Sequence, residues 1–375
     1  MRKPVKTRAA AAVLIILLLC GVLPGAALTE DVRYTADGYA YTVSYGYAQV
    51  IAYSGAFLPR TLPDSIDGYT VYLEYRDDIF SHLIRESGIY RYGRVAENEV
   101  YIVGWCGYEP VAMIPADIGG IPVTGIGDKA FWLSGCERET FADTVVVPDS
   151  VRYIGREAFS CTGIVSVYLG SGVREIGDLA FQGLSQSNFV LPAGVEKLGI
   201  NPFADHVDLG YVNGYLFPWP ESTAHFRVAE SNGSMLYGTE DMRLITYRAN
   251  LSPQWRRGTV VTVPDGIRVI GSHAFYAAQG ITEVVLPDTV EIIEPYAFIW
   301  SGELTRVRIP ESVTVLGKGA FESTAITELE IPSGVTVIGD ILFHSWAPEE
   351  ATIVCDPGSA AEAYAKANGY RIRFR

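Results

Sequence analysis

The sequence predicts a solenoid, a fold in which short repeated units stack into one elongated column. A phenylalanine returns every 22 or 23 residues of the 375-residue chain, in two series. The series are Phe159, Phe181 and Phe203, and Phe275, Phe298, Phe321 and Phe343. A glycine stands four residues before each of them, with Glu294 as the one exception. This fixed period indicates stacked coils, which offer a long repeated surface rather than an enclosed active-site cleft.

Each unit is expected to contain a strand, a turn and a buried plug. In one unit, residues 283–286 alternate between core-facing and solvent-facing positions, which is the pattern of a strand with one buried face. Pro287 then ends the strand pairing, and a brief helical turn at 294–297 leads to Phe298 in the centre of the coil. Because no single unit can bury its apolar side, neighbouring coils must stack to form the core.

The repeated pattern resembles the BspA-like (treponemal-type) leucine-rich repeats. The resemblance covers about residues 110–355 and rests on the proline after the strand and on a recurrent I-G-x-x-A-F segment, as in "VVVPDSVRYIGREAF". It implies a leucine-rich-repeat solenoid that is β-rich, with short helical turns and one strand of a parallel ladder per 22–23-residue repeat. Members of this family are mostly bacterial surface or secreted proteins that bind other proteins, including host matrix components. The resemblance therefore implies a protein partner and adhesion rather than catalysis.

These signals divide the chain into six segments. They are a signal peptide (1–27), N-terminal degenerate repeat and capping modules (28–109), a first repeat block (110–203), an irregular repeat with a β-hairpin insert (204–258), a second repeat block (259–350) and a C-terminal cap (351–375).

The N-terminus has the features of a secretory signal. A basic start is followed by an apolar run from Ala9 to Val22 and by small residues before Ala27, after which we expect cleavage. An uncleaved anchor stays open as the alternative, because the apolar stretch is long enough to span a bilayer. Cleavage would remove four positive charges and change the net charge from −14 to −18. We expect a secreted or cell-surface protein with no membrane span after cleavage, and no nucleic-acid partner, because phosphate backbones require clustered cations.

The capping modules appear twice in the sequence. Two stretches align at an offset of 52, which matches Tyr53 with Trp105 and Pro63 with Pro115. Each stretch is interpreted as a β-hairpin that leads into one coil and covers the apolar end of the solenoid.

Two further departures from the repeat are expected. Two alternating runs around 238–241 favour a β-hairpin that projects from the solenoid. At the C-terminus, Ser359 and Glu362 have the spacing of a capping box for a short helix that ends near Gly369. The alternating run after this helix predicts a final strand, so helix and strand together form the C-terminal helix-strand cap.

No motif for catalysis, for a cofactor or for a metal is found in the sequence. The histidines are scattered, and neither H-E-x-x-H, nor G-x-S-x-G, nor a phosphate-binding glycine loop occurs. We therefore expect no enzyme activity, no cofactor and no metal site. Cys136 and Cys161 follow the repeated A-F segment in neighbouring units, so they form either a disulfide or two buried small side chains.

The candidate functional surface is the solvent-facing side of the strands. Counting back from the strand-ending proline, positions −2 and −4 point outward, and equivalent positions on adjacent strands form rows. The predicted partner-binding face consists of Thr144, Val146, Ser166, Tyr168, Asn188, Val190, Glu283, Val285, Arg306 and Arg308. The rows of the second block alternate in sign, with Glu328 and Glu330 on the next strand, and predict ion pairs across the sheet.

The rows of the first block differ, because Val146, Tyr168 and Val190 form an exposed apolar line. Such a line is unusual on a monomer and predicts docking of a macromolecular partner. The alternative is that β-rich surfaces simply favour valine and tyrosine.

Two other functions stay open. In a carbohydrate-binding surface protein, exposed aromatic side chains would stack on sugar rings. The candidates are Trp105, Trp132, Trp219, Trp255, Trp300 and Trp346. An enzyme whose site is assembled from distant residues is the third hypothesis, and no motif supports it.

Overall fold

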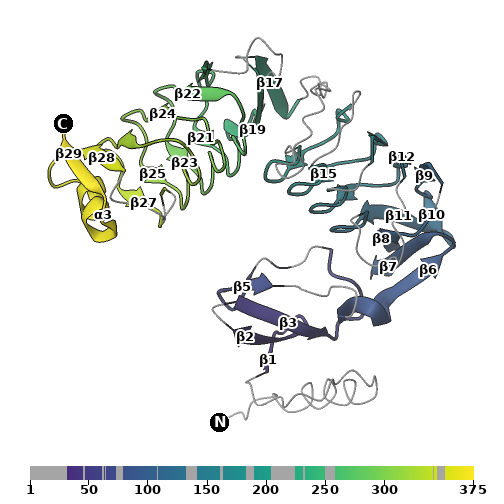
Figure 1. Ribbon diagram of the computed structural model, residues 1–375. Helices are drawn as coiled ribbons and strands as arrows, with labels where there is room; N and C mark the ends of the chain where they lie inside the picture. Colours follow the sequence, from purple (N-terminus) through teal and green to yellow (C-terminus); the bar gives the residue numbers. More distant parts are fainter. Residues whose placement is uncertain are drawn as a thin grey trace.

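The structure, a computed structural model, describes residues 32–375 with gaps and follows an open arch from N-terminal sheets to a C-terminal helix and strand (Figure 1). The gaps are 45–46, 61–62, 64, 73–78, 108, 132–141, 161–163, 183–189, 204–223, 231–232, 250–257, 341 and 344–350. The predicted signal peptide and both Cys136 and Cys161 lie outside the described residues. Within the described part, the predicted leucine-rich-repeat solenoid is confirmed.

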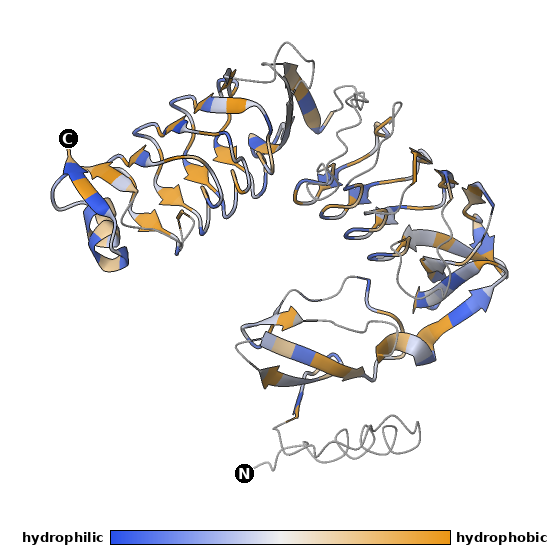
Figure 2. Cartoon of the chain, viewed as in Figure 1, coloured by the Kyte–Doolittle hydropathy of each residue, from blue (hydrophilic) through white to orange (hydrophobic). Residues whose placement is uncertain are grey.

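Two ladders of parallel strands run along the column, one before and one after the proline of each repeat. The pre-proline ladder contains β9 (Val111–Met113), β12 (Thr144–Val146) and β14 (Ser166–Tyr168) in the first block, and β20 (Thr259–Thr262), β22 (Ile281–Val285) and β24 (Arg306–Arg308) in the second. The next pre-proline strand, β26 (Glu328–Glu330), belongs to a separate C-terminal sheet. The post-proline ladder contains β11 (Ile121–Ile126), β13 (Tyr153–Ile154), β15 (Glu175–Ile176) and β16 (Lys197–Leu198), and then β21 (Val269–Ile270), β23 (Ile292–Ile293), β25 (Val315–Leu316) and β27 (Val337–Ile338). The post-proline strands of the second block are hydrophobic in Figure 2, which fits their place against the core.

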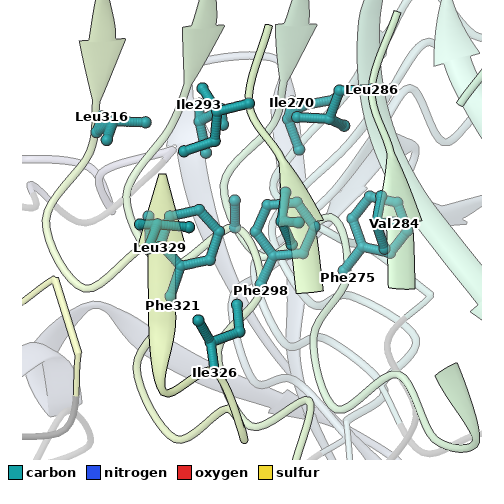
Figure 3. Close-up of a cluster of buried hydrophobic side chains, with 14 of the residues drawn as sticks. Ile270, Phe275, Val284, Leu286, Ile293, Phe298, Leu316, Phe321, Ile326 and Leu329 are labelled. Carbon is teal, nitrogen blue, oxygen red and sulfur yellow. The ribbon is translucent and has the colours of Figure 1, made fainter. Parts of the chain in front are cut away.

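The repeated phenylalanines form a buried column of rings between the two ladders. Ring centroids of Phe275 and Phe298 lie 4.9 Å apart, and those of Phe298 and Phe321 lie 5.3 Å apart. In the first block, the rings from Phe131 to Phe203 follow one another at 5.0, 5.4 and 5.8 Å. Figure 3 shows the rings of the second block side by side, with aliphatic side chains from both ladders around them. The prediction that the plugs point inward is confirmed.

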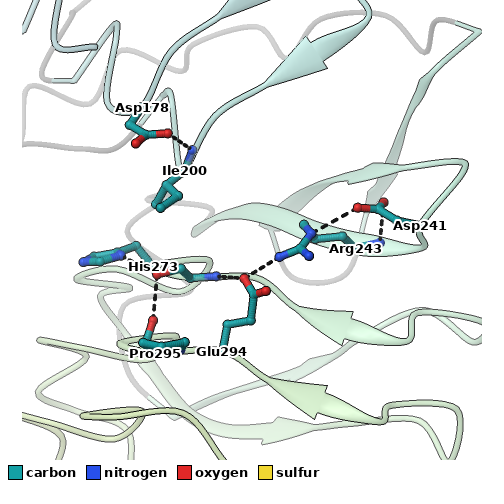
Figure 4. Close-up of polar contacts among 8 residues, drawn as sticks. Asp178, Ile200, Asp241, Arg243, His273, Glu294 and Pro295 are labelled. Atoms are coloured by element: carbon teal, nitrogen blue, oxygen red, sulfur yellow. Dashed lines mark hydrogen bonds and ion pairs between the residues drawn. The ribbon is translucent and has the colours of Figure 1, made fainter. Parts of the chain in front are cut away.

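The recurrence of a glycine four residues before each phenylalanine has a steric cause. A Cβ atom at Gly317 would lie 2.2 Å from the backbone nitrogen of Pro295 on the preceding coil, which no side chain can tolerate. Glu294 replaces the glycine in one coil, and there its carboxylate accepts a hydrogen bond from the backbone N–H of Ser272 at 2.9 Å. The same carboxylate forms an ion pair with Arg243 (Figure 4). The glycine therefore recurs in the repeat because adjacent coils approach each other too closely there for a Cβ atom.

Three antiparallel hairpins each start a stack of coils. They are β2 (Tyr39–Ser44) with β3 (Tyr47–Tyr53), β7 (Tyr90–Ala96) with β8 (Glu99–Trp105), and β18 (Gly233–Gly238) with β19 (Arg243–Ala249). In each hairpin the second strand pairs in parallel with a strand of the following coil, namely β5 (Tyr69–Tyr72), β11 or β21. An aromatic ring near the end of that second strand also contacts the first phenylalanine of its stack. These contacts are Tyr53–Phe80 at 5.3 Å, Trp105–Phe131 at 6.3 Å and Tyr247–Phe275 at 5.0 Å.

The remaining N-terminal elements follow the predicted duplication. They are β1 (Arg33–Tyr34), β4 (Ser65–Ile66), the 3-10 helix η1 (Ser81–Leu83), β6 (Ile84–Ser87) and β10 (Asp117–Ile118). The antiparallel pairs β4–β5 and β10–β11 begin 52 residues apart, at Ser65 and Asp117, as the alignment of the two stretches predicts.

The prediction that the insert hairpin projects from the solenoid is wrong. Strand β19 lies inside a seven-stranded sheet between β18 and β21, and β17 (Phe226–Glu230) pairs antiparallel with β18. The physical reason is that both faces of the hairpin carry apolar side chains, so both faces must be covered. Met235 and Leu244 pack into the core of the second block, whereas Leu236 and Ile245 pack into that of the first. The hairpin is therefore a wall shared by the two cores.

A hydrogen bond also joins the two blocks directly. The side-chain amide Nδ2 of Asn201, at the end of the first block, donates to the backbone carbonyl of His273 at 2.8 Å. Next to it, the carboxylate of Asp178 accepts a hydrogen bond from the backbone N–H of Ile200 at 2.6 Å (Figure 4). The arch is thus continuous through the insert.

The C-terminus closes the column. Helix α3 (Ala360–Asn368) begins at Ser359, whose hydroxyl accepts a hydrogen bond from the backbone N–H of Glu362 at 3.2 Å, and ends at Gly369 with φ 77°. Strands β28 (Thr352–Cys355) and β29 (Arg371–Phe374) extend the sheet of β26. The ring of Tyr370 contacts Phe343 at 5.5 Å and covers the last ring of the column. The predicted helix-strand cap is confirmed.

Candidate partner-binding face

The pre-proline ladder of the first block presents the predicted face in register. The described members of the predicted set, Thr144, Val146, Ser166, Tyr168 and Val190, are half-buried or exposed, and Asn188 lies outside the described residues. Val146 pairs directly with Tyr168, and the residues that precede them on the two strands, Val145 and Val167, are buried. Tyr168 is 55% exposed and Val190 is 75% exposed, so both side chains are available to a partner.

The structure adds two residues that the sequence analysis missed. Strand β9 pairs with β12 so that Val111 lies beside Thr144 and Met113 beside Val146. Val111 is 44% exposed and Met113 is 61% exposed. The signal was present in the sequence, because Pro115 also ends a strand and the same count back from it gives these two positions. We refer to Met113, Val146, Tyr168 and Val190 as the apolar row.

The second block presents charges at the same positions. Arg306 lies beside Glu283 with an Nε–Oε1 distance of 3.7 Å, and Arg308 lies beside Val285. All four belong to the predicted face, and the Glu283–Arg306 pair is confirmed. Among the described residues, Arg308 forms no ion pair.

The expected continuation of this charge ladder to Glu328 and Glu330 is wrong. Glu328 forms an ion pair with Arg373, and Glu330 lies 3.2 Å from Arg375. The reason is that β26 shares its sheet with β28 and β29 and not with β24, so the guanidinium groups of Arg373 and Arg375 reach its two glutamates. Hydrogen bonds that Arg375 donates to the carboxylates of Asp356 and then Glu311 raise the pKa of its guanidinium, which therefore stays charged.

A shallow depression of about 780 Å³ lies over this charged area. Its lining includes Arg306, Arg308, Glu328, Glu330 and Arg375. Because both basic and acidic side chains line the depression, it can bind either cationic or anionic groups. The apolar row, in contrast, presents hydrophobic side chains.

The tryptophans proposed for sugar binding divide into two groups. Trp105 is only 8% exposed and belongs to the ring column, so its proposed role in sugar binding is wrong. Trp300 is 47% exposed, and its ring lies 5.3 Å from that of Tyr276. The other four, Trp132, Trp219, Trp255 and Trp346, lie outside the described residues.

Within the described part of the chain, no group of three or more His, Cys, Asp and Glu side chains is arranged to hold a metal ion. Ser272 lies 3.0 Å from the Nδ1 atom of His273, but its hydroxyl donates to the backbone carbonyl of Pro295 at 2.7 Å. This serine–histidine pair is therefore part of the contact between coils.

Two further observations concern the cysteines and the helices. Cys106 is disulfide-bonded, whereas Cys355 is free and buried. Among the described residues, no helix combines the length and the apolar character that a bilayer-spanning segment needs.

The fold and the open strand face define the class, a leucine-rich-repeat solenoid with a continuous interior and an accessible ladder. The family model for the BspA type leucine-rich repeat region matches six copies, at residues 121–210 and 257–356. The chain belongs to this family.

The chain is also similar to several solved bacterial structures. A leucine-rich cell surface protein from Faecalibacterium prausnitzii is 20% identical, with 78% of this chain and 94% of that chain covered and a TM-score of 0.42. The pneumococcal vaccine antigen PcpA is 16% identical, with 78% and 98% covered and a TM-score of 0.45. A leucine-rich-repeat protein from Bacteroides capillosus is 29% identical, with 33% and 99% covered and a TM-score of 0.27. Among curated proteins, none matches the chain.

Proposed function

We propose that this protein is an exported, non-enzymatic binding or adhesion protein that docks a protein partner on its pre-proline strand face. The observation that carries the proposal is the apolar row, in which Tyr168 and Val190 are 55% and 75% exposed. Exposed apolar side chains that form a continuous line typically mark an interaction surface. Folding gains little from them, because their outer faces remain in water.

The ladder is well suited to hold such a row. Val145 and Val167 anchor the strands in the core, and every coil is fixed by the ring column behind them. A partner that covers the row meets side chains that are already positioned, so little conformational entropy is lost on binding. Complete burial of a large apolar side chain contributes roughly 1.5–3 kcal/mol, and the exposed halves of these side chains contribute correspondingly less.

Export is supported by two independent features. Residues 1–27 have the basic, apolar and small-residue pattern of a secretory signal. The disulfide at Cys106 fits an oxidising compartment outside the cytoplasm. Together they favour a secreted or cell-surface location, where a repeat surface meets external proteins.

The test is binding of the purified protein to a panel of purified extracellular-matrix proteins by biolayer interferometry. Tyr168→Asp and Val190→Glu should each weaken any binding at least tenfold, because they place a charge in the contact. Val337→Asp is the matched control, since Val337 is 54% exposed but lies on the post-proline ladder. Unchanged binding by folded Tyr168→Asp and Val190→Glu proteins would refute docking on this face.

Carbohydrate binding is the second candidate, and one observation favours it. Trp300 has a left-handed backbone conformation, with φ 63°, at a position that Ala277 and Ser323 occupy in the neighbouring coils. The conformation belongs to the repeat, because all three coils share it, and what distinguishes this coil is a half-exposed aromatic ring of the amphipathic kind found at binding surfaces. A glycan array should then show saturable binding that Trp300→Ala abolishes. An array without saturable binding would eliminate this candidate.

A further inference from the structure

Exposed acidic side chains lie at both ends of the strands that carry the apolar row. Glu109 and Asp143 precede strands β9 and β12, and Asp117 and Asp149 follow them. The nearest basic side chains in the described sequence, Arg152 and Arg174, donate to the backbone carbonyls of Gly172 and Ser171. Hydrogen bonds from Ser171 hold the pKa of Asp149 below its usual value, so this carboxylate stays ionised. We refer to Glu109 and Asp143 at one end of the strands, and to Asp117 and Asp149 at the other, as the acidic borders of the row.

The direction of the row limits the shape of a partner. Met113, Val146 and Tyr168 lie on adjacent paired strands in register, so the row runs across the strands and along the column. Neighbouring strands lie about 4.8 Å apart, which places these three side chains over roughly 10 Å. An α-helix presents one side chain per turn of about 5.4 Å, or roughly 11 Å over two turns. The two spacings differ by only about 1 Å over these three side chains.

An extended partner fits less well. Side chains on one face of a strand repeat at about 6.7 Å, so two intervals span roughly 13 Å and lose register with the row. A second copy of this chain is also disfavoured, because each copy carries a net charge of −14 and would place like-charged borders together. In the described part of the second block, Arg306 and Arg308 of β24 interrupt the outward apolar positions with two charges.

We propose that the apolar row binds an amphipathic α-helix of a partner protein, with its apolar stripe on the row and basic residues facing the acidic borders. This inference rests on the proposed function and specifies the chemistry of the partner. The helix lies along the column and places one apolar side chain against each coil. Lysine or arginine beside the stripe pairs with the acidic borders at the two ends of the strands, which makes the affinity dependent on salt.

The test uses a defined probe, a peptide of about 14 leucine and lysine residues designed as an amphipathic helix of roughly four turns. Its controls are a scrambled peptide of the same composition and a leucine–glutamate version. The full-length protein should bind the leucine–lysine helix at least tenfold more tightly than either control. Met113→Ser combined with Tyr168→Ser should weaken binding at least tenfold without a change in charge. Val337→Ser, on the other ladder, should leave it unchanged.

The acidic borders are tested separately. Asp143→Asn combined with Asp149→Asn should weaken binding and flatten its dependence on salt, because two partners of the basic residues are lost. The proposal is overturned if the scrambled or acidic peptide binds as tightly, if Met113→Ser with Tyr168→Ser changes nothing, or if the helix does not bind. If Tyr168→Asp abolishes binding to a matrix protein but the helical peptide fails, only this inference is wrong. If neither ligand depends on the row, the proposed function fails as well.

Discussion

Removal of one ring from the buried column should cost a large part of the stability of the second block. Phe298 is fully buried, with ring neighbours at 4.9 Å and 5.3 Å on the two adjacent coils. Truncation of a buried phenylalanine to alanine costs about 3–5 kcal/mol, because the transfer energy is lost and a cavity remains. Each aromatic contact adds about 0.5–1.5 kcal/mol to the contribution of the ring to the free energy of unfolding. We therefore expect Phe298→Ala to lower the free energy of unfolding by about 4 kcal/mol.

The assay is urea denaturation followed by circular dichroism, together with hydrogen exchange of the strands in the second block. Phe374→Ala is the matched control, because that ring is 51% exposed and should change stability by under about 0.5 kcal/mol. Since each coil contacts only its neighbours, protection should fall most strongly in β23 and β25. The reasoning is refuted if Phe298→Ala costs no more than Phe374→Ala.

Three further predictions concern the coils, the junction and the cap. Gly317→Ala should cost about 1–3 kcal/mol in urea denaturation, because its Cβ would overlap the preceding coil, whereas Gly302→Ala meets no atom within 4 Å and should be nearly neutral. Burial lowers the pKa of His273 and of His82 below the usual value of about 6.5, so the folded protein favours their neutral forms, and this contribution to stability is present above about pH 6.5 and is lost as the pH falls below it. The urea midpoint of the protein should therefore decrease when the pH is lowered from 7 to 5, and the midpoint of His273→Gln should decrease by a smaller amount. An equal decrease in both proteins would contradict the role of His273. Ser359→Ala should cost about 1 kcal/mol and increase exchange in helix α3, because its backbone cap is lost, and unchanged helix protection would disprove the role of the cap.

The features that could be predicted from the sequence are those set by local repetition. The period of 22 or 23 residues gave the stacked coils, and the count back from the proline gave the outward direction of Val146 and Tyr168. Both depend on alternation within a few residues, which the sequence shows directly. Met113 obeys the same rule, but it lies in the second of the two stretches that align at an offset of 52, which was interpreted as a cap.

The features that could not be predicted depend on contacts between distant segments. Glu330 pairs with Arg375, which lies 45 residues away, and nothing in the rows themselves indicates that the C-terminal strand reaches it. The insert hairpin was predicted as a hairpin, but its position depends on both of its faces being covered. Met235 and Leu236 are neighbours in the sequence and bury into different cores. Local alternation cannot identify which block covers each face.

The central claim is that a protein partner covers the apolar row. Hydroxyl-radical footprinting of the protein, free and saturated with a partner found in the binding panel, measures this side chain by side chain. The account predicts that Met113 and Tyr168 lose most of their reactivity towards hydroxyl radicals in the complex, whereas the reactivity of Val337 is the same in the free and the saturated protein. Equal reactivity of Met113 and Tyr168 in the free and saturated protein would contradict it.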